Sequence, residues 1–191
     1  MEKVDIREAE LLVWQIIVLV VASNLDDLGV GFSLGIKGEI QWRVIWIISI
    51  LSGVTMAAGL IIGDELADII PGNFAIYIAS IVLASIGIWF IWQGLKPSEE
   101  EPKMQSGNIG WKAAFILGLA LGIDSFAAGF SGGLTDFPII LTSVLAWLTS
   151  LIFVWLGSTF AGAISIKFVR DYAELFSGAC FILLALVILI F

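Results

Sequence analysis

Long apolar runs recur along this chain, and they leave few folds open to it. A helix needs about 20 consecutive apolar residues to cross the hydrocarbon core of a bilayer, which is roughly 30 Å thick. The runs do not alternate polar with apolar residues, as the strands of a membrane β-barrel would, so helices are the fold that satisfies the backbone in lipid. The sequence therefore predicts an all-α integral membrane protein with six transmembrane helices, at Leu11–Ile36, Trp42–Gly63, Phe74–Leu95, Trp111–Leu134, Pro138–Ala161 and Tyr172–Phe191.

The composition agrees with a bilayer as the solvent. Of the 191 residues, 60% are hydrophobic and 14% are charged, whereas a soluble domain carries about a quarter charged residues. A chain of this length could not bury so much apolar surface in a water-soluble core. We therefore expect the lipid bilayer to be the main partner of this chain.

Several function classes are excluded by what the chain lacks. There is no histidine, which removes imidazole metal sites and the Ser-His or Cys-His arrangements of hydrolases. There is no phosphate-binding loop of the GxxxxGK type and no basic patch, so we expect neither ATP-driven pumping nor a nucleic-acid partner. We predict that the protein is not an enzyme and uses no cofactor.

The basic residues predict an orientation. Six spans put the N-terminus, the second and fourth connectors and the C-terminus on one side of the membrane, and that side holds Lys3 and Arg7. The other side holds the rest of the nine basic residues: Lys37, Arg43, Lys96, Lys103, Lys112, Lys167 and Arg170. Because cytoplasmic segments are enriched in Lys and Arg, we expect both termini to be extracytoplasmic and residues 97–110 to form an acidic cytoplasmic linker.

Two segments of the chain repeat one another. "LDDLGVGFSLGI" (Leu25–Ile36) matches "IDSFAAGFSGGL" (Ile123–Leu134). The difference in residue number is constant along the match and aligns Asp26 with Asp124. The same offset extends into the next spans, where it aligns Ser52 with Ser150 and Gly59 with Gly157. A match that continues in register indicates an internal duplication.

The duplication predicts two inverted halves, residues 1–96 and residues 111–191. Each half holds three predicted spans, and an odd number of spans turns the second half over relative to the first. Inverted repeats are a transporter architecture whose site lies near mid-membrane, at the interface of the repeats. We therefore expect Asp26 and Asp124 to face each other deep in the bilayer.

The acidic residues in the spans need a compensating charge. A carboxylate at the bilayer centre costs about 2.5–3.5 kcal/mol on insertion scales, and Asp26, Asp27 and Asp124 have no Lys or Arg at comparable depth. A bound cation or a proton would balance them, and a site that exchanges the two would be a coupled exporter. Asp27 could instead face water or cap a broken helix, and the acids could be structural hydrogen-bonders.

The neighbouring polar residues are all oxygen donors, which suits hard divalent cations such as Mn²⁺, Mg²⁺ or Ca²⁺. Glycines in the same segments would let the helices loosen and offer backbone carbonyl groups. The predicted metal ligands are Asp26, Asp124, Asp27, Asn24, Ser125, Ser52 and Ser150.

The motifs "SNLDDLGVGFSLGIKG" and "LGIDSFAAGFSGGL", with "YAELFSGACFILLAL" in the last span, resemble those of the MntP-type manganese efflux pumps and the related YtaF-type sporulation membrane proteins. The resemblance implies a multi-pass protein of the bacterial cell membrane that exports Mn²⁺, with Asp26 and Asp124 at the ion site. The leading hypothesis is a secondary exporter of a divalent hard cation, to which counter-transported protons could be coupled. Ser52 stands where the manganese pumps carry an acidic residue, and Asn24 and Asp27 are closer to the sporulation branch. The alternatives are export of another cation, such as calcium or magnesium, and a non-transporting membrane scaffold associated with sporulation.

Overall fold

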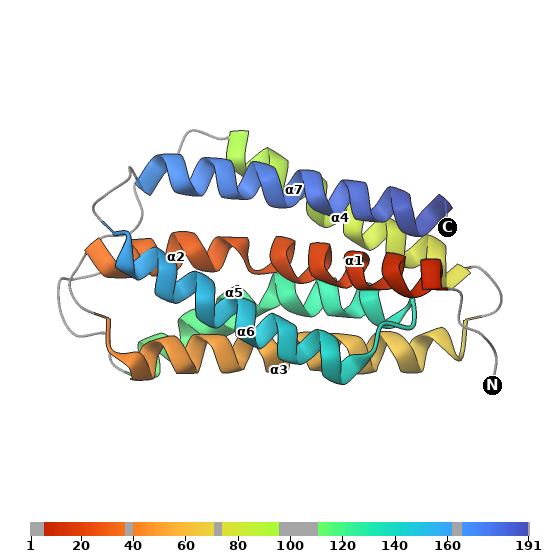
Figure 1. Cartoon of the computed structure of the whole chain (residues 1–191), viewed down its shortest axis with the longest axis horizontal. Helices are drawn as coiled ribbons and strands as arrows, with labels where there is room; N and C mark the ends of the chain where they lie inside the picture. Colours follow the sequence, from red (N-terminus) through yellow and green to blue (C-terminus); the bar gives the residue numbers. More distant parts are fainter. Residues whose placement is uncertain (1–5, 37–39, 71–73, 96–110, 162–165, 191) are drawn as a thin grey trace.

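The structure is a computed structural model that describes residues 6–36, 40–70, 74–95, 111–161 and 166–190. The described residues contain no strand and form the helices α1 (Ile6–Ser23), α2 (Leu25–Ile36), α3 (Trp42–Ala67), α4 (Phe74–Leu95), α5 (Trp111–Gly133), α6 (Ile139–Thr159) and α7 (Ile166–Ile190). The predicted linker 97–110 lies outside the described residues. All the helices run along one long axis, and the start of α1 lies at the same end of the bundle as the end of α7 (Figure 1).

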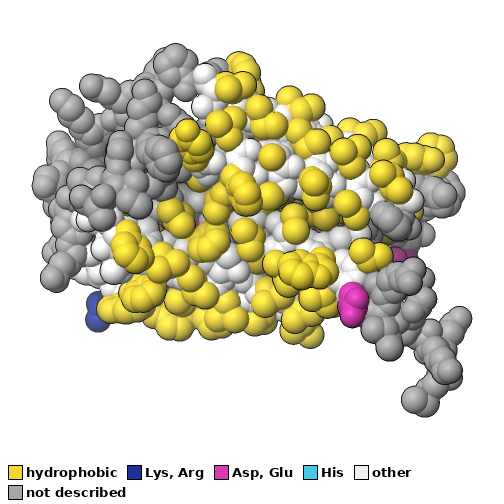
Figure 2. Space-filling view, turned by 45° about the horizontal axis from the view of Figure 1, so that its top comes forward, with side chains coloured by type: hydrophobic (Ala, Val, Ile, Leu, Met, Phe, Trp, Pro, Cys, Tyr) yellow, Lys and Arg dark blue, Asp and Glu magenta, His cyan; other side chains and the backbone are white. Residues whose placement is uncertain are grey.

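Most of these helices are long and apolar enough to span a membrane. By length and composition, five stretches qualify: Glu10–Gly35, Trp42–Ala67, Phe74–Leu95, Ala114–Gly133 and Ile139–Thr159. Within α7, the stretch Leu175–Ile190 is a shorter apolar helix. Hydrophobic side chains cover much of the described surface (Figure 2), as expected of a surface that faces lipid. The chain is thus an all-helical, multi-pass membrane protein.

The first predicted span is one continuous run in the sequence but two helices in the structure. α1 ends at Ser23, α2 begins at Leu25, and the side-chain amide of Asn24 donates a 2.7 Å hydrogen bond to the carbonyl of Val20. An asparagine side chain that bonds to the backbone competes with the helical hydrogen-bond ladder. The helix is therefore interrupted at Asn24, whereas Gly29, one of the glycines expected to loosen it, lies inside regular helix.

The interruption changes the setting of the two acidic residues that follow it. Asp26 and Asp27 occupy the first turn of α2, where the partial positive charge of a helix N-terminus favours a carboxylate. Asp124, by contrast, lies in the interior of the uninterrupted helix α5. The aligned aspartates thus share a position in the repeat but have different local backbone environments.

Two pairs of helices approach closely through glycines. Gly59 of α3 lies against the backbone of Phe126 in α5, and Gly157 of α6 lies against the backbone of Leu28 in α2; a β-carbon on either glycine would overlap these atoms. The residue offset of the sequence repeat aligns Gly59 with Gly157 and Leu28 with Phe126, so the two contacts are equivalent. In both pairs the contacting residue numbers rise together, so the paired helices run parallel.

The third pair, α4 and α7, crosses in an antiparallel arrangement. A β-carbon on Gly87 would lie 2.7 Å from the carbonyl oxygen of Gly178, and one on Gly178 would lie 2.6 Å from that of Gly87. Beside this crossing, the rings of Phe90 and Phe181 lie 5.9 Å apart between centroids. Because these contacts are reciprocal, each position in α4 has one equivalent position in α7.

Candidate metal site in the membrane interior

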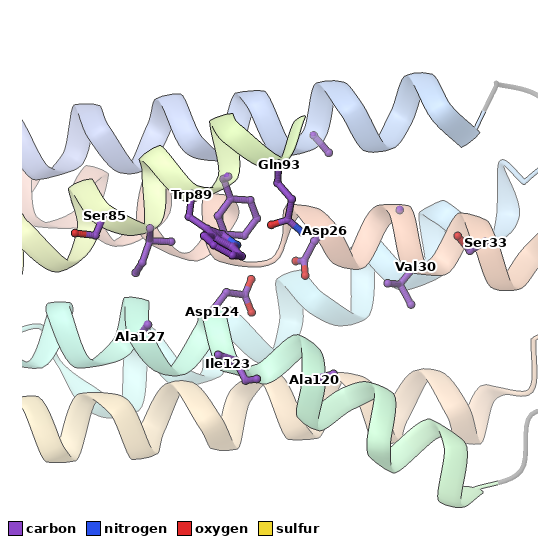
Figure 3. A pocket seen from close by; sticks show the side chains of 14 residues that line it. Asp26, Val30, Ser33, Ser85, Trp89, Gln93, Ala120, Ile123, Asp124 and Ala127 are labelled. Carbon is purple, nitrogen blue, oxygen red and sulfur yellow. The ribbon is translucent and has the colours of Figure 1, made fainter. Parts of the chain in front are cut away.

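A cavity of about 580 Å³ lies among α2, α4, α5 and α7, and it opens onto the surface of the bundle beside Trp89 and Ile123, which are 56% and 71% exposed. Asp26 of α2 and Asp124 of α5 both line this cavity, and their carboxyl groups point toward one another (Figure 3). The two acids that the repeat aligns are therefore brought together from helices far apart in the sequence. The polar lining is completed by Ser33, Ser85 and Gln93.

Asp124 carries the least compensated group of the site. Both of its carboxyl oxygens are buried, and neither has a hydrogen-bond partner among the described residues. Asp26 and Asp27 lie close enough to interact with it electrostatically. Since an isolated buried carboxylate is costly unless it is paired or neutralised, this position calls for a cation or a proton.

Asp27 lies outside the cavity. It is buried, with 2% of its surface exposed, and it faces Ser150 of α6 rather than the cavity between α2 and α5. Its Oδ2 atom and the Ser150 hydroxyl have no hydrogen-bond partner in the described part of the chain. Asp27 and Ser150, both predicted as ligands, thus do not line the cavity, although Asp27 lies within electrostatic reach of Asp26 and Asp124.

Three further predicted ligands form a buried hydrogen-bonded chain behind the cavity. The Ser52 hydroxyl donates to Asn24 Oδ1 at 2.6 Å, and it lies 3.2 Å from the Ser125 hydroxyl. Because the single Ser52 proton goes to Asn24, Ser125 is the donor to Ser52. The chain joins the α1–α2 interruption to α3 and α5, and none of its members lines the cavity.

A cation in this cavity would have few protein ligands. Among the described residues, no group of three or more His, Cys, Asp or Glu side chains comes together as a metal-binding cluster. Two carboxyl groups with neutral oxygens and water are, however, the ligands that Mg²⁺-like ions accept, because these ions retain several waters. The donors present fit a hard, partly hydrated divalent cation.

The sequence pattern in α4 held a signal that the ligand prediction missed. Ser85, Trp89 and Gln93 recur every fourth residue and therefore share one face of the helix, and all three line the cavity. Gln93 is the one side-chain amide in α4. A polar residue on a single face of an otherwise apolar span is a sign of a lined cavity.

Paired carboxyl groups that line one cavity of a helical membrane bundle are typical of the class of ion transporters. A family model described as "Putative manganese efflux pump" matches residues 1–76 and 68–189. The chain belongs to this family, which confirms the resemblance in the motifs.

The similar proteins include both branches of that resemblance. The chain is 27% identical over 173 residues to "Probable sporulation protein YtaF" of Bacillus subtilis, covering 74% of this chain and 82% of the relative. It is 25% identical over 190 residues to "Putative manganese efflux pump MntP" of Syntrophomonas wolfei, covering 90% of this chain and 94% of the relative. It is 31% identical over 138 residues to the protein of the same name from Methanoregula boonei, covering 72% and 71%. No solved structure matches the chain.

Proposed function

We propose that this protein is a secondary exporter of a divalent hard cation, manganese, and that Asp26 and Asp124 form its ion site. The observation that carries the proposal is the pair of carboxyl groups across one cavity, with both Asp124 oxygens buried and without hydrogen bonds among the described residues. The names of the relatives favour manganese as the cargo. A bound divalent cation would neutralise both carboxylates at once.

Coupling to protons follows from the same charges. When the cation leaves, two facing carboxylates remain at mid-membrane, where charge is costly. Protons entering the emptied cavity would remove that cost and reset the site. The sequence has no nucleotide-binding loop, so a counter-flow of protons is the energy source that we propose.

The architecture that we propose is six spans in two inverted halves, residues 1–96 and residues 111–191. Two sets of glycine contacts support it. The contact of Gly59 with α5 is equivalent to the contact of Gly157 with α2, and Gly87 contacts its own equivalent, Gly178. α7, 25 residues long, is the sixth span of this arrangement. The two-fold axis would pass between Asp26 and Asp124.

The cargo is tested by metal toxicity. We expect expression in a manganese-sensitive strain to relieve Mn²⁺ toxicity and to leave Zn²⁺ and Cu⁺ toxicity unchanged, because oxygen ligands do not favour softer ions. Growth at graded concentrations of each metal measures this, with the Asp124→Asn variant as the inactive control. Relief of zinc or copper toxicity would contradict an all-oxygen site, and relief of calcium or magnesium stress alone would assign a different hard cation.

The orientation is tested by labelling cysteines placed at the two ends of the bundle. In a Cys180→Ala background, we expect Asp68→Cys, on the side of the chain termini, to react with an impermeant maleimide in intact cells. Gln41→Cys, on the opposite side, should react only after the cells are broken. Both positions are exposed. The reverse pattern would overturn the proposal that the termini are extracytoplasmic.

A membrane scaffold in sporulation is the second candidate, and the similarity to YtaF favours it. A scaffold has no use for facing carboxyl groups in a cavity. If it were the true function, Asp26→Asn and Asp124→Asn would leave the cellular phenotype intact. Complementation of a sporulation defect by these two variants separates the candidates.

A further inference from the structure

The cavity contains an amide side chain at the level of the carboxyl pair. Gln93 lines the cavity, and its side chain reaches from α4 toward Asp26 (Figure 3). An amide can present its NH₂ group to a carboxylate or its oxygen to a cation. With the oxygens of Asp26 and Asp124, a Gln93 oxygen would give a cation three protein ligands from three helices.

The second half of the chain has no amide at the related position. The crossing of Gly87 with Gly178 brings Ile182 beside Gly87 and Ile91 beside Gly178. These reciprocal contacts make Gly87 equivalent to Gly178, and Ile91 equivalent to Ile182, in the two halves. Counted two residues further along each helix, the position equivalent to Gln93 is Leu184 of α7. One half thus offers an oxygen ligand where the other offers an alkyl side chain.

The surroundings of the two positions differ as well. Leu184 is buried, with 2% of its surface exposed, in an apolar cluster with Leu19 of α1 and Phe181. The cavity extends from the carboxyl pair in both directions, along α2 to Ser33 and along α4 to Ser85 (Figure 3). Of the two related positions, Gln93 therefore lines the cavity, whereas Leu184 is packed in the apolar cluster.

We propose that Gln93 is an affinity-determining ligand of the transported cation in the state that the structure shows, in which Gln93 lines the cavity and Leu184 is packed in the apolar cluster. This rests on the proposed function. When the two halves exchange roles, Leu184 takes the related position and the cation loses one oxygen ligand. The site would then bind the cation more tightly in one of its two orientations than in the other, which gives transport a direction.

The test compares Gln93→Leu with the matched control Gln41→Leu, which removes an exposed amide outside the cavity. Everted and right-side-out vesicles report Mn²⁺ exchange from the two faces separately. For Gln93→Leu we expect the KM from one membrane face to rise by about tenfold or more, since even an outer partner of a metal ligand is typically worth about 10–100-fold in affinity. The KM from the other face should stay at its wild-type value.

Direct binding provides a second readout. The electron paramagnetic resonance signal of free Mn²⁺, titrated with the purified full chain, should show weaker binding by Gln93→Leu. Gln93→Glu, which keeps an oxygen at this position, should bind at least as tightly as wild type. Unchanged binding by Gln93→Leu, or an equal rise of KM on both faces, would overturn the proposal. If Asp26→Asn and Asp124→Asn also left binding unchanged, the proposed function itself would fail.

Discussion

Asp26→Asn and Asp124→Asn are each expected to reduce Mn²⁺ efflux by about 100-fold or more while the protein still folds and inserts. Asparagine keeps the size of the side chain and part of its hydrogen bonding but removes the charge that holds the cation. Removing one partner of a buried ion pair costs about 3–5 kcal/mol, and about 1.4 kcal/mol is a factor of ten in binding. The measurement is Mn²⁺ efflux from loaded vesicles, normalised to the amount of folded protein.

Three further variants make this prediction specific to the site. The double variant should be no worse than either single one, because members of one functional unit are not additive. Asp27→Asn should have a milder effect, since Asp27 does not line the cavity. Asp136→Asn, in an exposed turn with φ of 59° that asparagine tolerates, should transport like wild type. Full efflux by both single variants would contradict the proposed ion site and would indicate that Asp26 and Asp124 have a structural role.

Gly59→Ala and Gly157→Ala are expected to destabilise the bundle by about 3 kcal/mol or more, at the upper end of the usual cost of overpacking. A methyl group at Gly59 would overlap the carbonyl oxygen of Phe126, and one at Gly157 would overlap that of Leu28. The backbone cannot yield as a flexible side chain would, so the helices must separate. Thermal unfolding in detergent should show Tm lowered by about 5 °C or more.

Gly29→Ala is the matched control for this pair. It adds the same methyl group to a helix, but no atom lies within 4 Å of the added carbon. Because alanine stabilises a helix interior relative to glycine by about 1 kcal/mol, Tm should stay level or rise slightly. Equal Tm values for Gly29→Ala, Gly59→Ala and Gly157→Ala would show that the close contacts do not limit stability.

The sequence by itself determined the class of protein and the identity of its paired acids. Apolar runs of membrane length are a local property, because a helix in lipid satisfies its own backbone and needs no partner to be recognised. The offset that places Asp26 on Asp124 is likewise visible in the chain alone. Both features can be recognised from the sequence alone because they do not depend on how the helices pack.

The tertiary structure decided which polar side chains share the cavity. Asp26 and Asp27 are adjacent in the sequence but point about 100° apart around a helix, so the rotation of α2 against its neighbours decides which one lines the cavity. At the interruption, the Asn24 side chain accepts a hydrogen bond from Ser52 in α3, a partner distant in the sequence. Gln93 reaches the carboxyl pair only because α4 packs against α5 and α7 around the cavity. Helix rotation and crossing come from side-chain packing between segments distant in the chain, and a one-dimensional pattern of apolar runs does not encode them.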